Sequence, residues 1–419
     1  MFAACFLFSL ALMVACTDDA GKKGNIGDEK TPMKPSENSS KTSQLKAFKG
    51  LQISDPTTSK NLQVFFIYSD KDSKDLEKDY LTLTEGTKSN KVIVTEQKNA
   101  QVQRLVISNK SKEPLFIAAG ELVKGGKQDR TIQVCMVVPA GEEDVPLPSF
   151  CVEQSRWSSG KKFKATPSMA GNTNIQAIAQ KKQGLVWTSV KKAKDGLRYN
   201  AKTLAKKAVG TSSTTSLNEE LSDVDVKKLI SAYKKDTTEA LNKIKKPVVG
   251  FAYAVNGKMV AMHVFKSSKL FKKMWDKYVV SMAIDAGSTK IKKEYKPATK
   301  VSVNEFVKFL RKGKKHTEKF VPDNKSVRYL DKKHYTIEAF YKDSPIYIML
   351  GSFDKEHIQL RKAQRANTLI GIDNSSFGRH QNQTINAPLT SSTGNNLPYS
   401  SPDIRANTPQ NANQSEPKK

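Results

Sequence analysis

Chemically capable side chains are concentrated between Glu113 and Trp157. A glycine-rich polar turn from Gly120 to Arg130 contributes Glu121, Lys127 and Gln128 in addition to Arg130 itself. Two cations, an amide and accessible backbone N–H groups in one turn suit a phosphate, sulfate or carboxylate ligand. The alternative is a structural hairpin tip in which Glu121 pairs with a nearby cation.

A second group closes this stretch: Cys151, Glu153, Arg156 and Trp157. Residues two apart on a strand share a face, so Cys151 and Glu153 lie side by side. A cysteine nucleophile needs a cationic partner and usually a histidine base, and no histidine lies within a hundred residues of Cys151. The alternatives are a buried structural cysteine and a Glu153–Arg156 ion pair with Trp157 stacked on the guanidinium.

Signatures of metal and cofactor sites are missing from the sequence. There is no HExxH, CxxC or DxDxDG pattern, no serine-hydrolase elbow, and no Walker spacing after Gly120. We therefore predict neither a metal nor a cofactor.

Composition indicates one packed domain with polar extensions. The chain has 419 residues, of which 37% are hydrophobic, and a net charge of +29. From the changes in composition we predict a signal segment at 1–16, a disordered tether at 17–49, a domain at 50–365 with a Lys-rich loop at 195–218, and a disordered tail at 366–419.

The first sixteen residues, MFAACFLFSLALMVAC, are apolar and too short to span a bilayer. Their last four residues are typical of a bacterial lipoprotein processing site, which predicts lipidation of Cys16 and a lipid-anchored location in the cell envelope. No Lys or Arg precedes the apolar run, which leaves an uncleaved anchor or a buried helix as alternatives.

The positive charge is local. Residues 158–210 hold twelve Lys or Arg against one acid, and residues 290–335 hold fifteen against five. Sixty of the seventy basic residues are Lys, whereas base and phosphate readout favours Arg. We therefore expect a solvated basic surface, attraction to anionic lipid or attraction to an envelope polymer, and we argue against nucleic acid.

Short β-rich runs predict a mainly antiparallel, sandwich- or barrel-like sheet. They are Leu62–Tyr68, Tyr80–Glu85, Val92–Thr95, Val102–Ser108 and Leu115–Ala119 in the first half, followed by 328–330, 335–341 and 346–350. Asn256-Gly257 between two apolar runs predicts a type I′ hairpin.

Helices are predicted in the second half, at 172–194, after Asp223, after Ser267, at 301–310 and at 354–365. The helix after Ser267 carries an apolar stripe of Leu270, Phe271, Met274, Trp275, Tyr278, Val279 and Met282. The predicted fold class is therefore α+β, with several helices packed on the sheet.

Cys135 and Cys151 raise the question of a disulfide, because an exported protein can form one. A hairpin of 131–138 with 145–152 would place position 135 opposite about 148 and the two sulfurs on opposite faces, unless a proline bulge shifts the register.

The runs GELVKGGKQDR, VVPAG, FCVEQSRW, QGLVWTSV and GFAYAVNGKMVAMHVF together resemble the ARG-and-rhodanese-phosphatase-superfamily-associated protein domain. That family name records genomic company and assigns no reaction. The resemblance implicates Glu121, Lys127, Gln128, Arg130, Cys151, Glu153, Arg156 and Trp157 as site residues.

The favoured hypothesis is an envelope lipoprotein that binds an anionic small molecule or polymer through the 120–130 turn and the 151–157 strand end. One alternative is a hydrolase of phosphate- or ADP-ribose-containing compounds, which rests on the genomic company alone. Another is a structural envelope protein with no ligand.

Overall fold

The computed structural model describes residues 50–70, 74–96, 104–153, 160, 162–210, 214–355 and 357–359. The predicted signal segment with Cys16, the tether, the tail, Arg156 and Trp157 lie outside these ranges, so the predicted domain boundaries stay predictions. Within the described ranges, no helix has the length and apolar character needed to cross a membrane.

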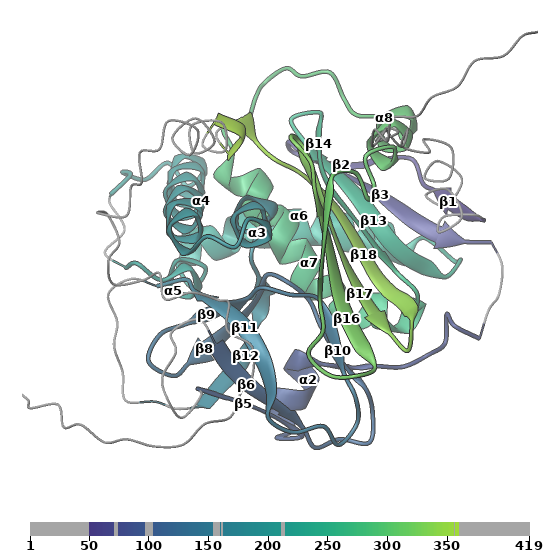
Figure 1. Ribbon diagram of the computed structural model, residues 1–419. Coiled ribbons are helices and arrows are strands. Elements are labelled where there is room, and N and C mark those ends of the chain that lie inside the picture. The colour runs from purple at the N-terminus through teal and green to yellow at the C-terminus, as the bar shows by residue number, and fades with distance from the viewer. Residues whose placement is uncertain are drawn as a thin grey trace, which may run out of the picture. The chain divides into compact units, whose positions relative to one another are not determined.

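The larger of the sheets has nine antiparallel strands (Figure 1). Their order is β1 (Leu51–Ile53), β3 (Leu62–Ser69), β13 (Val248–Val255), β14 (Lys258–Phe265), β18 (Ser344–Ser352), β17 (His334–Tyr341), β16 (Asn324–Leu330) and β15 (Lys314–Glu318), with β2 (Thr57–Ser59) paired to β3. Asn256 and Gly257 join β13 to β14 with φ values of 48° and 75°. These positive angles are those that a type I′ turn requires, which confirms the predicted hairpin.

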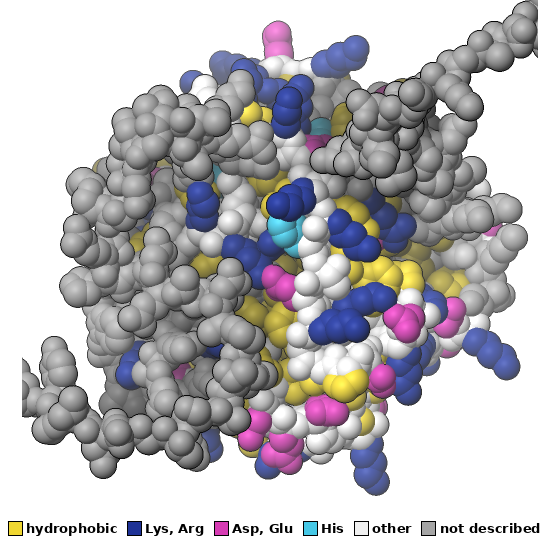
Figure 2. All heavy atoms as spheres, in the orientation of Figure 1, with side chains coloured by type: hydrophobic (Ala, Val, Ile, Leu, Met, Phe, Trp, Pro, Cys, Tyr) yellow, Lys and Arg dark blue, Asp and Glu magenta, His cyan; other side chains and the backbone are white. Residues whose placement is uncertain are grey.

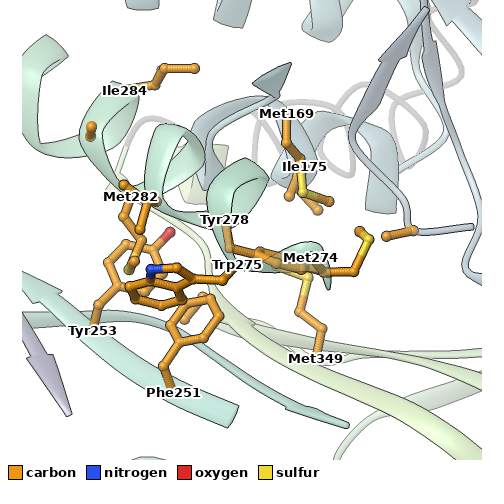
Figure 3. Packing of buried hydrophobic residues seen from close by; sticks show 14 of the residues in the cluster. Met169, Ile175, Phe251, Tyr253, Met274, Trp275, Tyr278, Met282, Ile284 and Met349 are labelled. Carbon is orange, nitrogen blue, oxygen red and sulfur yellow. The ribbon is translucent and has the colours of Figure 1, made fainter. Parts of the chain in front are cut away.

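Helix α7 (Ser268–Ser288) packs on one face of this sheet beside α6 (Val224–Asn242). The Ser267 hydroxyl caps α7 by accepting from the Leu270 N–H at 3.1 Å. All seven residues of the predicted apolar stripe are buried, and Figure 3 shows Trp275 above Phe251 of β13, with ring centroids 5.8 Å apart. The opposite face of the sheet is covered by α8 (Lys300–Val307).

Six further strands close into a barrel, in the order β11-β6-β5-β12-β8-β9. They span Val145–Cys151, Arg104–Asn109, Val92–Glu96, Lys162–Met169, Glu121–Gly125 and Arg130–Ile132, respectively. A smaller sheet of β10 (Met136–Val138), β7 (Leu115–Ile117) and β4 (Leu81–Thr82) lies next to it. The α+β class with a mainly antiparallel, partly barrel-like sheet is therefore confirmed.

The expected hairpin of 131–138 with 145–152 is wrong in detail. Strand β9 pairs with β11, with Cys151 opposite Arg130 and Ser149 opposite Ile132. The chain then leaves the barrel, and β10 pairs with β7 instead. Cys135 and Cys151 are both free and buried, so no disulfide forms between them.

Three other sequence predictions need correction. The expected strand at 80–85 is limited to β4 (Leu81–Thr82), and the chain then enters helix α2 (Leu83–Lys88), because Thr82 and Glu85 form a capping box. The expected helix at 172–194 is divided into α3 (Asn172–Ala179) and α4 (Gln183–Leu204). The expected loop at 195–218 begins as the second half of α4, and α5 (Leu217–Glu220) starts at its end.

A row of polar side chains on α7 runs along one edge of the apolar stripe. Lys277, Ser281 and Asp285 recur every four residues and are all buried, because residues four apart lie on one helix face. The Ser281 hydroxyl donates to the Ala170 carbonyl at 2.8 Å. The Asp285 carboxylate accepts from the Asn172 N–H at 2.7 Å and from the Tyr253 hydroxyl at 2.7 Å, so it caps α3 and ties it to the large sheet.

His263 of β14 lies in the interior between α7 and the sheet. Its ring stacks on Phe251 at 4.7 Å, and its Nδ1 lies 2.7 Å from the Tyr347 hydroxyl. Burial lowers the pKa of His263 from 6.5 to about 3, so the buried ring stays neutral at physiological pH.

This burial predicts an acid-dependent loss of stability. Because the folded-state pKa of His263 is depressed, its contribution is present above pH 6.5 and is lost as the pH falls toward 3. Between pH 6.5 and 4.5 the loss is about 2 kcal/mol. Urea denaturation of His263→Gln across this range should show a shallower pH dependence than the parent chain. His316→Gln, in edge strand β15, should flatten the slope less, because burial lowers the pKa of His316 too but its side chain is only half-buried, and equal slopes for all three proteins would contradict the assignment.

Candidate functional site

Several of the predicted site residues meet at one end of the barrel. Val94, Leu105 and Leu147 fill its interior, and the strand alternation places Glu96, Arg130, Ser149 and Cys151 on the same inner face. With Gln128, Asp129 and Glu153, these residues form what we call the barrel-end cluster. An apolar barrel core thus ends in a charged layer.

Arg130 is the centre of the barrel-end cluster and is only 2% exposed. Its guanidinium donates to the Gln128 carbonyl at 3.0 Å and lies 3.7 Å from the Glu96 carboxylate. The Glu96 carboxylate also accepts from the Lys127 N–H at 2.9 Å. The cation of Arg130 is therefore directed at neighbouring protein groups inside the barrel.

Asp129 connects the barrel-end cluster to the helical layer. Its backbone N–H donates to the Glu153 carboxylate at 3.4 Å, and its own carboxylate accepts from the Asn218 amide at 2.8 Å and the Ser216 hydroxyl at 3.4 Å. Ser216 and Asn218 lie at the start of α5. The cluster thus holds the segment before α5 against the barrel.

Cys151 is 1% exposed, and its backbone is held on both sides by the Gln183 side chain at 2.9 and 2.8 Å. Burial raises the pKa of the Cys151 thiol, and the Arg130 charge opposes this shift. Burial likewise raises the pKa of Cys135 to about 12. Both sulfurs are therefore held as buried thiols, an environment that disfavours the thiolate a nucleophile requires.

Glu121 lies apart from the barrel-end cluster. It is fully buried at the start of β8, where its carboxylate accepts from the Ala118 N–H at 2.9 Å and pairs with the Lys277 ammonium of α7. Lys127 is half-buried. The structure therefore brings Gln128, Arg130, Cys151 and Glu153 together, places Glu121 on the α7 side, and does not describe Arg156 or Trp157.

A second feature lies along α4, where a cavity of about 550 Å³ opens beside Val209, Gly210, Thr214 and Thr215. We call it the α4 groove. Three cationic side chains and one acidic side chain line it: Lys191, Lys194, Arg198 and Asp195. The aromatic side chains of Trp187 and Tyr199 complete the helical wall, and Tyr199 is 53% exposed.

Two buried N–H donors in this wall have no hydrogen-bond acceptor among the described residues. They are the Trp187 indole Nε1 and the Arg198 Nε. The other end of the Arg198 guanidinium donates to the Glu220 carboxylate at 2.9 Å, which raises the pKa of Arg198. Lys194 donates to the Thr214 carbonyl, and burial lowers the pKa of its ammonium.

The α4 groove was missed at the sequence level because residues 195–218 were assigned to a loop. The signal is nevertheless present. Trp187, Lys191, Lys194 and Arg198 are spaced by four, three and four residues, which is the spacing of one helix face. Three lysines and several small residues in 201–210 weaken the apolar spacing that would otherwise indicate the last turns of α4.

The described residues hold no group of three or more His, Cys, Asp or Glu side chains arranged to bind a metal ion.

An open antiparallel sheet, a closed barrel and a buried helix between them define the class of this α+β domain. A model of the ARG and Rhodanese-Phosphatase-superfamily-associated Protein domain matches residues 50–350, and the chain belongs to that family. The resemblance inferred from the sequence motifs is therefore confirmed. No curated protein and no solved structure matches the chain.

The Glu121–Lys277 pair generates a stability prediction. Lys277→Met leaves a buried carboxylate without its cation and should cost about 3–5 kcal/mol of unfolding free energy. The double variant Glu121→Gln/Lys277→Met removes both charges and keeps an acceptor for the Ala118 N–H, so most of the loss should be recovered. Urea denaturation of the parent, both single variants and the double variant measures the coupling, and additive effects would contradict it.

Proposed function

We propose that this domain is a binding module for an anionic small molecule that carries a ring, and that the α4 groove is its site. The observation that supports this most strongly is the pair of buried donors, Trp187 Nε1 and Arg198 Nε, in the wall of a positively charged cavity. Buried donors in proteins almost always have an acceptor. A bound phosphate or carboxylate would provide one for each.

The size and chemistry of the groove agree with this proposal. A volume of about 550 Å³ falls within the range of small-molecule sites. Lys191 pairs with Asp195 at 2.7 Å and Arg198 pairs with Glu220 at 2.9 Å, so Lys194 gives the groove one net positive charge, which favours an anion. The exposed ring of Tyr199 gives a planar group of the ligand a surface on which to stack.

Burial argues for the α4 groove over the barrel-end cluster as the place where a ligand binds. Arg130, Gln128 and Cys151 are each 3% exposed or less, so a ligand cannot reach them from the surface, although the Arg130 Nε also has no acceptor among the described residues. In our proposal the barrel-end cluster has a structural role. It holds the segment before α5 in place, and Thr214 and Thr215 of that segment form part of the groove wall. Hydrolysis by a cysteine nucleophile finds no support in a thiol that is buried and neutral.

The proposal predicts the effect of two exposed substitutions. Lys191→Ala/Tyr199→Ala removes one cation and one stacking ring, and it should weaken binding roughly 30-fold or more without lowering the melting temperature. Isothermal calorimetry with phosphate, adenosine, ribose 5-phosphate, AMP and ADP-ribose provides the measurement. AMP or ADP-ribose should bind more tightly than either adenosine or ribose 5-phosphate.

The control is Leu204→Ala/Lys206→Ala, which removes one exposed apolar side chain and one exposed cation at the end of α4, outside the groove lining. It should leave binding unchanged. The proposal fails if the parent chain binds none of these ligands at millimolar concentration, or if the control weakens binding as much as the groove variant.

We further propose that the chain is an envelope lipoprotein, on the basis of the apolar run that ends at Cys16. Cys16→Ser should abolish incorporation of labelled palmitate in a bacterial host and release the chain from the membrane fraction. Cys5→Ser is the matched control, since it alters the other cysteine of the same run and should leave labelling unchanged. Labelling that persists in Cys16→Ser would contradict this location.

A further inference from the structure

One end of the nine-stranded sheet gathers basic residues from five segments that are far apart in the sequence. They are the turns 60–61, 256–258 and 331–333, the segment 289–296 after α7, and the segment 311–314 before β15. Together these segments hold eleven Lys or Arg against two acids, Glu294 and Asp331. We call this surface the basic end.

Register and hydrogen bonds place the five segments together. Leu62 at the start of β3 lies opposite Val255, which pairs with Lys258, and Lys314 lies opposite Leu330 at the other side of the sheet. The Asn256 amide donates to the Lys290 carbonyl at 3.0 Å, and the Tyr295 hydroxyl donates to the Lys60 carbonyl at 3.1 Å. The segment 289–296 is therefore fixed across the turn that joins β13 to β14.

The charges at the basic end are not neutralised by the described part of the chain. Ten of the eleven cations are exposed lysines: Lys60, Lys258, Lys290, Lys292, Lys293, Lys296, Lys312, Lys314, Lys332 and Lys333. None of these ten forms an ion pair with a described carboxylate, whereas Arg311 binds Glu338 at 2.7 Å. Their positive charge is therefore directed at the solvent.

The opposite end of the same sheet has a different balance. The segments 69–70, 246–247, 265–266, 318–323 and 342–343 hold four Lys against four acids. Two of these four lysines pair with carboxylates, Lys246 with Asp70 and Lys266 with Asp75 at 3.2 Å. Figure 2 shows dark blue side chains along the upper edge of the molecule, the edge at which the β13–β14 hairpin turn lies in Figure 1.

We propose that the basic end is a docking surface for an anionic lipid bilayer. Lysine is a point charge that attracts a charged surface without fixed geometry, and lysine provides all but one of these cations. Nucleic-acid recognition favours Arg and stacking aromatic rings. The predicted lipid attachment at Cys16 would keep the domain near such a surface.

Vesicle sedimentation of the full-length chain tests this proposal. Neutral phosphatidylcholine vesicles are compared with vesicles that contain phosphatidylglycerol, so that any lipid anchor contributes equally to both. The parent chain should prefer the anionic vesicles. The preference should weaken steeply as salt is raised toward 0.5 M, because counter-ions screen exposed charges.

Charge reversal at the basic end should remove the preference. The variant Lys292→Glu/Lys293→Glu/Lys296→Glu should lower the preference for anionic over neutral vesicles by about 100-fold at low salt. Lys314→Glu/Lys332→Glu/Lys333→Glu, which alters different segments of the same surface, should do the same. All six side chains are exposed, and unchanged melting temperatures would show that the variants remain folded.

The matched control reverses three exposed barrel lysines, Lys112, Lys124 and Lys164, and changes the net charge equally. It should retain most of the preference. An equal loss in the control would attribute binding to net charge and overturn the docking surface. A loss confined to the 292–296 variant would overturn a surface built from several segments. Tighter binding to a DNA duplex than to the anionic vesicles at the same salt would overturn the lipid assignment.

Discussion

Burying the Lys277 ammonium beside the Glu121 carboxylate removes two charges from water, and the arrangement of the domain depends on where this pair lies. Lys277 belongs to α7, the helix whose apolar stripe covers the large sheet, and Glu121 begins a strand of the barrel. A buried charge without its partner is strongly unfavourable. The barrel must therefore meet α7 in one register, and Ser281 and Asp285 extend the same contact to α3.

The apolar stripe and the polar row beside it explain how α7 contacts both the sheet and the barrel. Its aromatic residues pack against Phe251 and Phe66 of the sheet, where contact area supplies most of the free energy. Its polar row meets the barrel and α3 through hydrogen bonds that require defined partners. Packing thus fixes α7 on the sheet, and the polar row fixes the position of the barrel.

Local patterns in the sequence were sufficient for most elements but not for their partners. Asn256-Gly257 is predictable from turn geometry alone, and the stripe from Leu270 to Met282 is predictable from helical spacing alone. The pairing of β9 with β11 cannot be predicted from a local pattern. Between residues 133 and 135 the chain passes from one sheet to another, and nothing in the residue pattern marks the change. The same holds for the site. Strand alternation identified Cys151 and Glu153 as neighbours and left Arg130 in a separate turn. Barrel closure brings the three together and buries them, and the α4 groove appears only once 195–204 is helical.

The short path from Arg130 to Val138 has one more consequence. Within nine residues the chain passes from the closed barrel into the smaller sheet, and the Val137 carbonyl accepts from the Asn324 amide of the large sheet at 2.8 Å. Pulling this segment out of any one sheet disturbs the other two. Amide hydrogens in all three sheets should therefore exchange through a shared opening, so that the folded domain behaves as a single cooperative unit and not as a barrel joined to a sheet.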